Sequence, residues 1–212
     1  MVNLANDQVG SNVPKEVLSM VTTDKRVART QLALRDALEK LAQTHEYHEI
    51  TVTKLTQTAG INRKTFYLHY DSIDDLIDTF ADQVSGGLGK IIQSYSFKTV
   101  YTHPGLMLDD AVTYVRANDA VIQHLLFPKN YTRFAQRIED NLVVILTKSI
   151  RQSYPIDQQD AEIAAYFMVH NTLSLFSRFS RDHHLDFDQF KSYVARLNLT
   201  GLSSFFDPRK AY

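Results

Sequence analysis

Apolar residues recur at helical spacing through most of the chain. In residues 24–44 the apolar positions Val27, Leu34, Leu38 and Leu41 have helical spacing, and Ala and Leu residues occupy neighbouring positions. Asp24 precedes them as a suitable N-cap residue. Similar stripes predict four longer helices, over residues 107–126, 131–153, 157–181 and 187–206. The pattern therefore predicts an all-α fold.

Two short helices are predicted between these longer ones. Thr51 can cap a helix over Val52–Ala59, and Gly60 follows it where a left-handed residue ends many helices. Asn62 can then cap a third helix after only two intervening residues. Two short helices joined by a glycine-containing turn indicate a helix-turn-helix.

Glycines and prolines predict the remaining boundaries. A helix opens at Asp71, and Gly86, Gly87 and Gly89 should kink or break it, because each glycine disfavours a helix interior by about 1 kcal/mol relative to alanine. The segment 103–105 reads as a turn. One apolar stripe, over residues 157–181, covers more than one face and must be buried on two sides.

Composition excludes several classes of protein. The 212 residues contain 7 Gly and 5 Pro, too few turn residues for a sandwich or barrel. Cysteine is absent, which excludes disulfides, thiolate catalysis and cysteine-based metal sites. We find no run of 18 apolar residues and no secretory signal, so we expect a cytoplasmic protein without membrane contact.

Charge is distributed unevenly along the chain. The net charge is −1, yet residues 24–70 hold eight basic and five acidic side chains, a local charge of +3. A basic segment on an acidic body suits a protein that binds duplex DNA with one end.

The helix-turn-helix segment, TVTKLTQTAGINRKTFYLHY at residues 51–70, has side chains of the right chemistry in the right places. Arg63, Lys64 and Thr65 begin the second helix, where base edges are met in the major groove. Tyr67 follows one turn later and suits a phosphate oxygen. The complete set of predicted DNA-binding residues is Lys25, Arg26, Thr51, Thr53, Asn62, Arg63, Lys64, Thr65, Tyr67 and His69.

The pattern T-V-x-x-L-x-x-x-A-G-I-N-x-x-T-F-Y-x-H-Y in this segment resembles the tetracycline-repressor (TetR) family of bacterial regulators. The resemblance runs from Arg26 to about Leu76, and the remaining chain is similar only in its architecture, closest to a Firmicutes-type subgroup with a divergent C-terminal domain. It implies a DNA-binding domain at 24–72 and a helical effector-binding and dimerisation domain at 73–212. Residues 1–23 are polar and lack periodicity, so we predict a flexible tail there.

The resemblance also implies a two-fold homodimer that binds a palindromic operator, most simply as a repressor, with activation as an alternative. Polar tips on otherwise apolar helices suggest an effector pocket, for a small molecule or a protein, at Tyr95, Tyr101, His124, Tyr131, Tyr166 and His170. The last two helices are the expected dimer interface, with Phe167, Leu175, Phe179, Leu197, Gly201 and Phe205.

Other functions have less support in the sequence. His45 and His48 share a helical face but lack an HExxH pattern, so we predict a surface loop there and no metal site. No nucleophile elbow or phosphate loop is present, and we predict no cofactor and no enzymatic activity. The alternative from another class is a helical protein-interaction module, or an activator that works with a protein partner and needs no small ligand.

Overall fold

The computed structural model describes residues 25–117, 132–181 and 186–206, and every regular element in these ranges is helical, which confirms the all-α prediction. The elements are α2 (Lys25–Ala42), the 3₁₀ turn η1 (Tyr47–Glu49), α3 (Val52–Ala59), α4 (Arg63–Tyr67), α5 (Ile73–Ser94), α6 (Phe97–Thr102), α7 (Pro104–Ala117), α9 (Thr132–Ser153), α10 (Gln158–Arg181) and α11 (Phe187–Phe206). The predicted cap at Asp24 and the predicted end of the helix over residues 107–126 lie outside the described residues.

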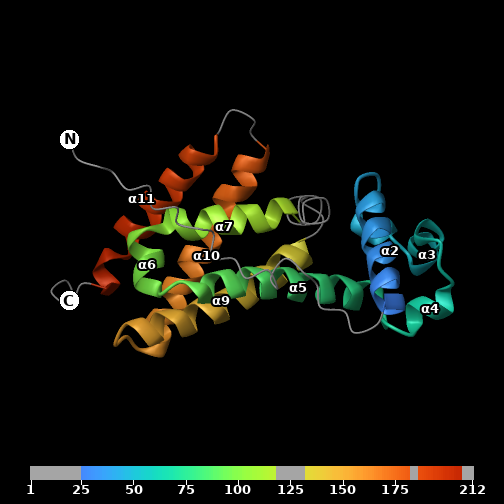
Figure 1. Cartoon of the computed structure of the whole chain (residues 1–212), viewed down its shortest axis with the longest axis horizontal. Helices are drawn as coiled ribbons and strands as arrows, with labels where there is room; N and C mark the ends of the chain where they lie inside the picture. The colour runs from blue at the N-terminus through green and yellow to red at the C-terminus, as the bar shows by residue number, and fades with distance from the viewer. Residues whose placement is uncertain (1–24, 118–131, 182–185, 207–212) are drawn as a thin grey trace, which may run out of the picture.

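The molecule has a small head and a larger body (Figure 1). Helices α2, α3 and α4 form the head at one end, and α6, α7, α9, α10 and α11 form the body. Helix α5 begins beside the head and runs into the body, where it packs along α9 (Figure 1). One continuous helix therefore joins the two parts.

Most predicted helices are confirmed, and α6 was missed. Helix α3 has the predicted bounds, and α9, α10 and α11 begin within one residue of theirs. The predicted turn at 103–105 is only partly right, because Pro104 is the first residue of α7, where its missing N–H costs nothing. Helix α6 has only six residues, too few to show a helical repeat, and Ser96 caps it by accepting a hydrogen bond from the Thr99 amide at 3.1 Å.

The predicted break in α5 is wrong. Helix α5 continues through all three glycines, none of which has a positive φ. A Cβ atom at Gly87 would overlap the Tyr114 ring of α7, and one at Gly89 would lie 2.5 Å from Cδ1 of Ile145 on α9. These two glycines let neighbouring helices approach α5 closely, and that packing outweighs their poor helix propensity.

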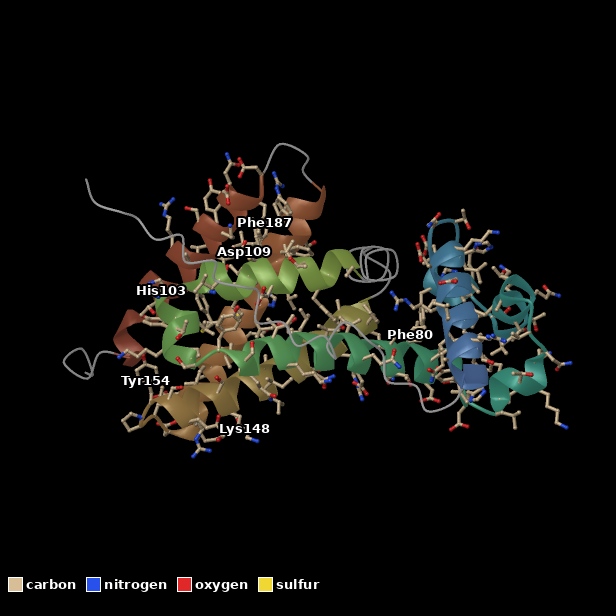
Figure 2. The ribbon with its side chains drawn as sticks, viewed as in Figure 1. Phe80, His103, Asp109, Lys148, Tyr154 and Phe187 are labelled. Carbon is tan, nitrogen blue, oxygen red and sulfur yellow. The ribbon has the colours of Figure 1, made fainter. Side chains whose placement is uncertain are left out.

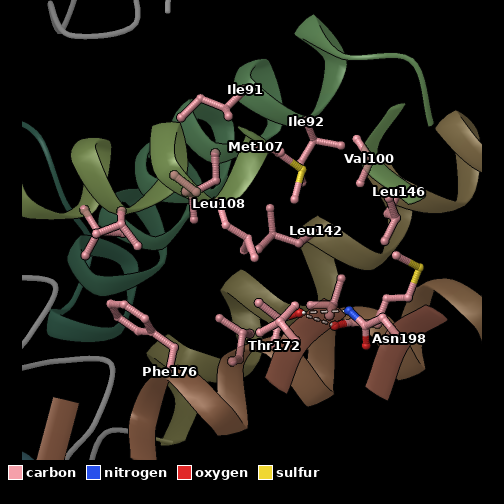
Figure 3. Close-up of a pocket in the computed structure, with 18 of the residues that line it drawn as sticks. Ile91, Ile92, Val100, Met107, Leu108, Leu142, Leu146, Thr172, Phe176 and Asn198 are labelled. Carbon is pink, nitrogen blue, oxygen red and sulfur yellow. Dashed lines mark hydrogen bonds between the residues drawn. The ribbon is translucent and has the colours of Figure 1, made fainter. Parts of the chain in front are cut away.

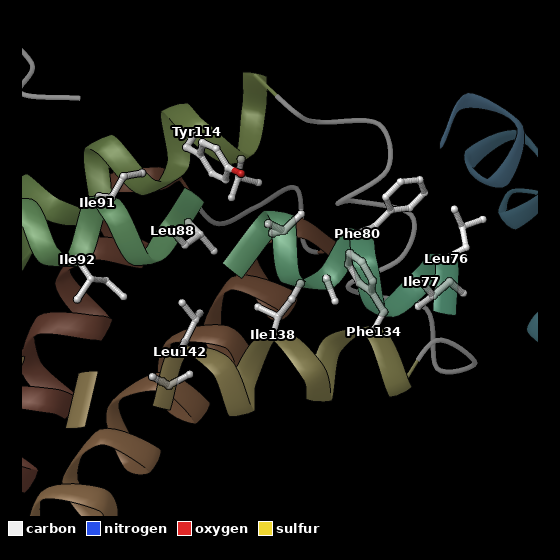
Figure 4. Packing of buried hydrophobic residues seen from close by; sticks show 14 of the residues in the cluster. Leu76, Ile77, Phe80, Leu88, Ile91, Ile92, Tyr114, Phe134, Ile138 and Leu142 are labelled. Atoms are coloured by element: carbon white, nitrogen blue, oxygen red, sulfur yellow. The ribbon is translucent and has the colours of Figure 1, made fainter. Parts of the chain in front are cut away.

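The main core lies between α5 and α9 (Figure 4). Leu76, Ile77 and Phe80 of α5 meet Phe134 and Ile138 of α9, and each of these side chains is at most 4% exposed. Leu108 and Val112 of α7 form a second cluster with Phe190 and Val194 of α11. The body is thus a bundle with two connected apolar layers.

Two sets of ion pairs tie the body helices together at the surface. Arg133 of α9 binds Asp78 of α5 with two hydrogen bonds of 3.0 and 2.7 Å, and Arg137 binds Asp82 in the same way at 2.8 and 2.9 Å. Lys191 of α11 donates to Asp109 of α7 at 3.0 Å, and its ammonium lies 4.9 Å from the centre of the Phe187 ring. Asp109 and Phe187 are labelled in Figure 2. Among the helices of the described residues, none is both long enough and apolar enough to cross a bilayer.

Candidate nucleic-acid interface

Local hydrogen bonds define the helix-turn-helix as predicted. Thr51 Oγ1 accepts from the Lys54 amide at 3.2 Å, and Asn62 Oδ1 accepts from the Lys64 amide at 2.8 Å. Gly60 has φ +66° and ψ 27°, and its amide donates to the Gln57 carbonyl at 3.2 Å. The next amide donates to the Thr56 carbonyl at 3.0 Å, which completes a Schellman turn.

Buried apolar side chains hold the two short helices against α2. Leu55 of α3 and Phe66 of α4 are fully buried, and they join Leu34 and Leu38 of α2 in the same core cluster. Tyr70 is 4% exposed, and its ring lies 5.7 Å from the Phe66 ring. Phe66 lies on the inward side of α4, and Arg63, Lys64 and Tyr67 lie on the exposed side.

The exposed side of α4 carries the chemistry expected of a recognition helix. Arg63 and Lys64 are exposed in its first turn, and Tyr67 is 50% exposed one turn later. The Tyr67 ring rests edge-on against Phe66 at 5.4 Å, so a buried residue orients an exposed hydroxyl. One short helix therefore presents two positively charged side chains and a phenol whose ring packs on a buried residue.

The other predicted DNA-binding residues differ in how available they are. Thr53 is exposed, whereas Thr65 and His69 are half-buried. Thr51 and Asn62 are exposed, but each uses its side-chain oxygen to cap a helix. The side chains of Lys25 and Arg26 lie outside the described residues.

Two further side chains of the head are candidates that sequence reasoning did not select. Lys54 is exposed in the first turn of α3, and Leu68 is 73% exposed directly after α4. Lys54 could have been selected from the sequence, because it is a basic residue in the first turn of the first helix of the motif. Nothing in the sequence around Leu68 separates an exposed leucine from a buried one, because Leu68 lies outside any apolar stripe.

A cavity of about 130 Å³ lies in the body, between α5, α6, α7, α9, α10 and α11 (Figure 3). Of the predicted pocket residues, Tyr101 lines it. Tyr95 instead donates its hydroxyl hydrogen to Asp110 at 2.6 Å, and burial together with that carboxylate raises the pKa of Tyr95 to about 12. His124 and Tyr131 lie outside the described residues.

The placement of Tyr166 and His170 in the pocket is wrong. Both are exposed, their rings stack at 5.5 Å, and His170 Nδ1 lies 2.8 Å from Glu139 Oε1. The reason is helical rotation, since Ala161, Ala165 and Met168 occupy the inward face of α10.

The predicted interface residues fall into three groups. Phe167 is 41% and Leu197 45% exposed, so both are accessible on the protomer. Leu175 and Phe179 are half-buried against the protomer's own second cluster. The structure says nothing of the surroundings of Gly201 and Phe205, which lie beyond the described side chains.

In the part of the chain that the structure describes, no three His, Asp or Glu side chains gather as a metal site would require. Of the two histidines considered above, His45 precedes η1 and contacts the Thr44 hydroxyl, whereas His48 lies within η1, 3.8 Å from Glu46.

Comparison with known proteins gives separate evidence about the helix-turn-helix segment. Residues 34–79 match the family described as "Bacterial regulatory proteins, tetR family". An uncharacterised HTH-type transcriptional regulator of Bacillus subtilis, YxbF, is 39% identical over 71 residues, which is 33% of this chain and 19% of that protein. The HTH-type dhaKLM operon transcriptional activator DhaS of Lactococcus lactis is 36% identical over 53 residues, 25% of this chain and 28% of DhaS.

A solved structure also matches, that of the TetR family repressor AlkX from Dietzia, with a TM-score of 0.49 and 20% identity over 82% of this chain and 96% of that chain. The two curated relatives are matched over less than a third of their own length. The family match, by contrast, spans the second half of α2, all of α3, the Gly60 turn and α4, and the start of α5. The segment that forms the helix-turn-helix is thus similar to the tetR family of bacterial regulatory proteins.

Proposed function

We propose that this protein is a sequence-specific transcription regulator that binds a palindromic operator as a homodimer and responds to an effector held in its body. One observation carries the proposal: α4 buries Phe66 and presents Arg63, Lys64 and Tyr67 to solvent. In a helix-turn-helix, the start of the second helix meets base edges in the major groove.

Each exposed side chain of α4 has a role that its chemistry supports. Arg63 and Lys64 can donate to guanine O6 and N7, which distinguishes a G·C pair from the others. Tyr67 has one hydroxyl on a rigid ring, which suits a phosphate oxygen and carries no sequence information. Lys54, at the start of α3, adds a positive charge where the first helix would cross the backbone.

The proposed dimer is supported by an apolar face that the protomer leaves uncovered. Ile163, Tyr166 and Phe167 of α10 are 41–54% exposed, and Tyr193 and Leu197 of α11 are each 45% exposed. Helices α10 and α11 pack against each other, so these residues lie on neighbouring elements. A second copy would bury them and place two copies of α4 for two half-sites.

An effector role is supported by the position of α5. Its N-terminal end touches the head, since Tyr47 of η1 donates a hydrogen bond to Asp74. Its C-terminal half supplies Leu88, Ile91 and Ile92 to the cavity. A ligand that shifts these residues would move the helix on which the head rests, and so alter the spacing of the two heads.

The simplest form of regulation is repression, in which the dimer bound at a promoter blocks transcription. Such a regulator would act in the cytoplasm. Activation is the second candidate, because the relative DhaS is named a transcriptional activator. The same contacts to DNA serve both, and a protein effector is compatible with either.

Selection of bound duplexes from a random library tests the proposal. We expect a two-fold symmetric site to be enriched, with an affinity that falls steeply between about 50 and 200 mM salt as counterions are released. With the double variant Arg63→Ala/Lys64→Ala, which keeps Phe66, the same selection should yield no consensus sequence. Failure of the unaltered protein to enrich any sequence would favour the alternative of a protein-interaction module.

A further inference from the structure

The cavity in the body is almost entirely apolar. Its walls are leucine, isoleucine, valine, methionine, alanine and phenylalanine side chains, such as Ile91, Met107, Leu142 and Phe176 (Figure 3). Among its described lining residues, none is Asp, Glu, Lys, Arg or His. An ionised carboxylate or ammonium placed here would lose its hydration without gaining an opposite charge.

Tyr101 does not change this character. It lies among the lining residues with its ring stacked on Phe97 at 6.1 Å, and burial raises the pKa of its phenol. It therefore stays uncharged at neutral pH. The buried carboxylate on α7, Asp110, accepts the Tyr95 hydroxyl hydrogen and does not line the cavity.

The polar side chains of the lining other than Tyr101 are Thr172 of α10 and Asn198 of α11, and they lie together (Figure 3). Asn198 is 5% exposed, and its Oδ1 accepts from Asn171 Nδ2 at 2.8 Å. Its Nδ2 donates to Thr172 Oγ1 at 3.4 Å, a long hydrogen bond, while Thr172 donates to the Met168 carbonyl at 2.7 Å.

This arrangement leaves hydrogen-bonding capacity at one side of the cavity. A primary amide has two N–H donors and an oxygen with two lone pairs. The contacts among the described residues use one donor and one lone pair of Asn198, so a further donor and acceptor remain for a bound molecule.

We infer that the cavity binds an uncharged, mainly apolar small molecule that carries one hydroxyl or carbonyl group, placed against Asn198 and Thr172. The volume of about 130 Å³ suits a molecule about the size of benzene, with roughly six non-hydrogen atoms, since an apolar cavity of about 150 Å³ holds benzene. This inference rests on the proposed effector function of the body and specifies its ligand.

Calorimetric titration of the full-length protein with 1-hexanol, hexanoate and hexylammonium at pH 7 tests the inference. The three probes share a six-carbon chain and differ in charge. We expect 1-hexanol to bind at least tenfold more tightly than either ion. Equal or tighter binding of hexanoate or hexylammonium would overturn the inference, and so would no detectable binding of 1-hexanol at millimolar concentration.

Two variants separate the polar contact from the cavity itself. Asn198→Leu should weaken 1-hexanol about five- to tenfold, the usual value of one hydrogen bond, and leave toluene binding unchanged. Retained toluene binding shows that this variant is folded. Ala111→Phe should fill the space and abolish binding of both probes, whereas Val144→Ala, at a position 71% exposed on α9, should change neither.

The inference and the proposed function fail in different ways. If 1-hexanol binds as described but the affinity for the selected duplex is unchanged, the ligand class stands and the effector role is wrong. If Asn198→Leu leaves 1-hexanol binding intact, the assigned polar contact is wrong. This conclusion does not depend on the affinity of the protein for DNA.

Discussion

At the scale of single residues, Gly60 has the strictest conformational requirement in the head. Its φ of +66° belongs to the left-handed region, and it is the one residue with a positive φ among those described. There is open space around a Cβ at this position, so only the backbone conformation opposes a side chain.

We therefore expect Gly60→Ala to destabilise the protein by about 1–2 kcal/mol, the cost of a left-handed conformation for a residue with a Cβ. Urea denaturation of the variant and the unaltered chain measures the difference. Gly60→Asn should lose less, because asparagine tolerates this region better. Equal stability of all three proteins would contradict the assigned turn.

Residues of α4 should divide into those that read bases and one that binds the backbone. Replacing a base-reading Arg63 or Lys64 by alanine should cost about 1–3 kcal/mol on the operator and relax preference at one position of each half-site. Tyr67→Phe should weaken operator and random duplexes alike, because phosphates carry no sequence.

Affinities for both duplexes at two salt concentrations distinguish these outcomes. If Arg63→Ala and Lys64→Ala both keep full discrimination, the first turn of α4 does not read bases. Lys54→Ala, in the first turn of α3, provides a comparison for loss of positive charge alone, with a salt slope lower by about one.

At the scale of elements, the three glycines of α5 differ in how closely neighbouring helices approach them. Gly86 has open space around it, whereas Gly87 faces the buried Tyr114 ring and Gly89 the end of the Ile145 side chain. The terminal methyl of an isoleucine can move aside more easily than a buried ring that is only 6% exposed.

Alanine substitutions should consequently have opposite effects at adjacent positions. Gly86→Ala should stabilise the protein by about 0.5–1 kcal/mol through helix propensity. Gly87→Ala should destabilise it by about 1–3 kcal/mol, because the added methyl overpacks the contact with α7. Chemical denaturation measures both, and a stabilising Gly87→Ala would show that α7 does not approach α5 as described.

The contact between α5 and α9 should depend on pH. The Arg137 hydrogen bonds, followed by that from Asn141, hold the pKa of Asp82 below its ordinary value of about 4. A carboxyl with a lowered pKa in the folded state stabilises the protein above its unfolded pKa, and this contribution is lost as the pH falls through the folded pKa.

Asp82→Asn should accordingly be less stable than the unaltered chain at about pH 6, and the difference should shrink below about pH 4. Unfolding free energies measured across this range give the comparison. Asp36→Asn, at an exposed position on α2, serves as the matched substitution. A difference that stays constant down to pH 2 would show that the Arg137 pair does not contribute in solution.

At the scale of the whole molecule, the proposed dimer depends on the outward faces of α10 and α11. The inward face of α10 uses small residues, Ala161, Ala164 and Ala165, which let it pack closely on α9. Its outward face keeps larger apolar residues such as Phe167. Contiguous apolar faces of this kind are uncommon on monomeric proteins and mark sites of protein interaction.

We expect the double variant Phe167→Asp/Leu197→Asp to be monomeric and folded, because both side chains are exposed on the protomer and would carry buried charges in the dimer. Light scattering gives the mass and circular dichroism the helix content. Val144→Asp, which places the same charge on an exposed apolar position of α9, should leave the dimer intact. A double variant that remains dimeric would place the interface elsewhere.

The sequence by itself determined most of the long helices, together with the caps and the turn of the helix-turn-helix. Thr51, Gly60 and Asn62 act on neighbours within five positions, so their roles are set by local hydrogen bonds and backbone sterics. Phe66 and Tyr70 are four residues apart, a spacing that places both on the same, buried side.

Only the tertiary structure decided the course of α5, the ion pairs with α9 and the lining of the cavity. Gly87 meets a residue 27 positions later, and Asp78 pairs with a residue 55 positions later, distances that no local pattern spans. The cavity was misassigned at Tyr166 and His170 because a polar tip on an apolar helix marks either a pocket or a surface. Which of the two it marks depends on the rotation of α10 against its neighbours, and that rotation is set by packing across the whole bundle.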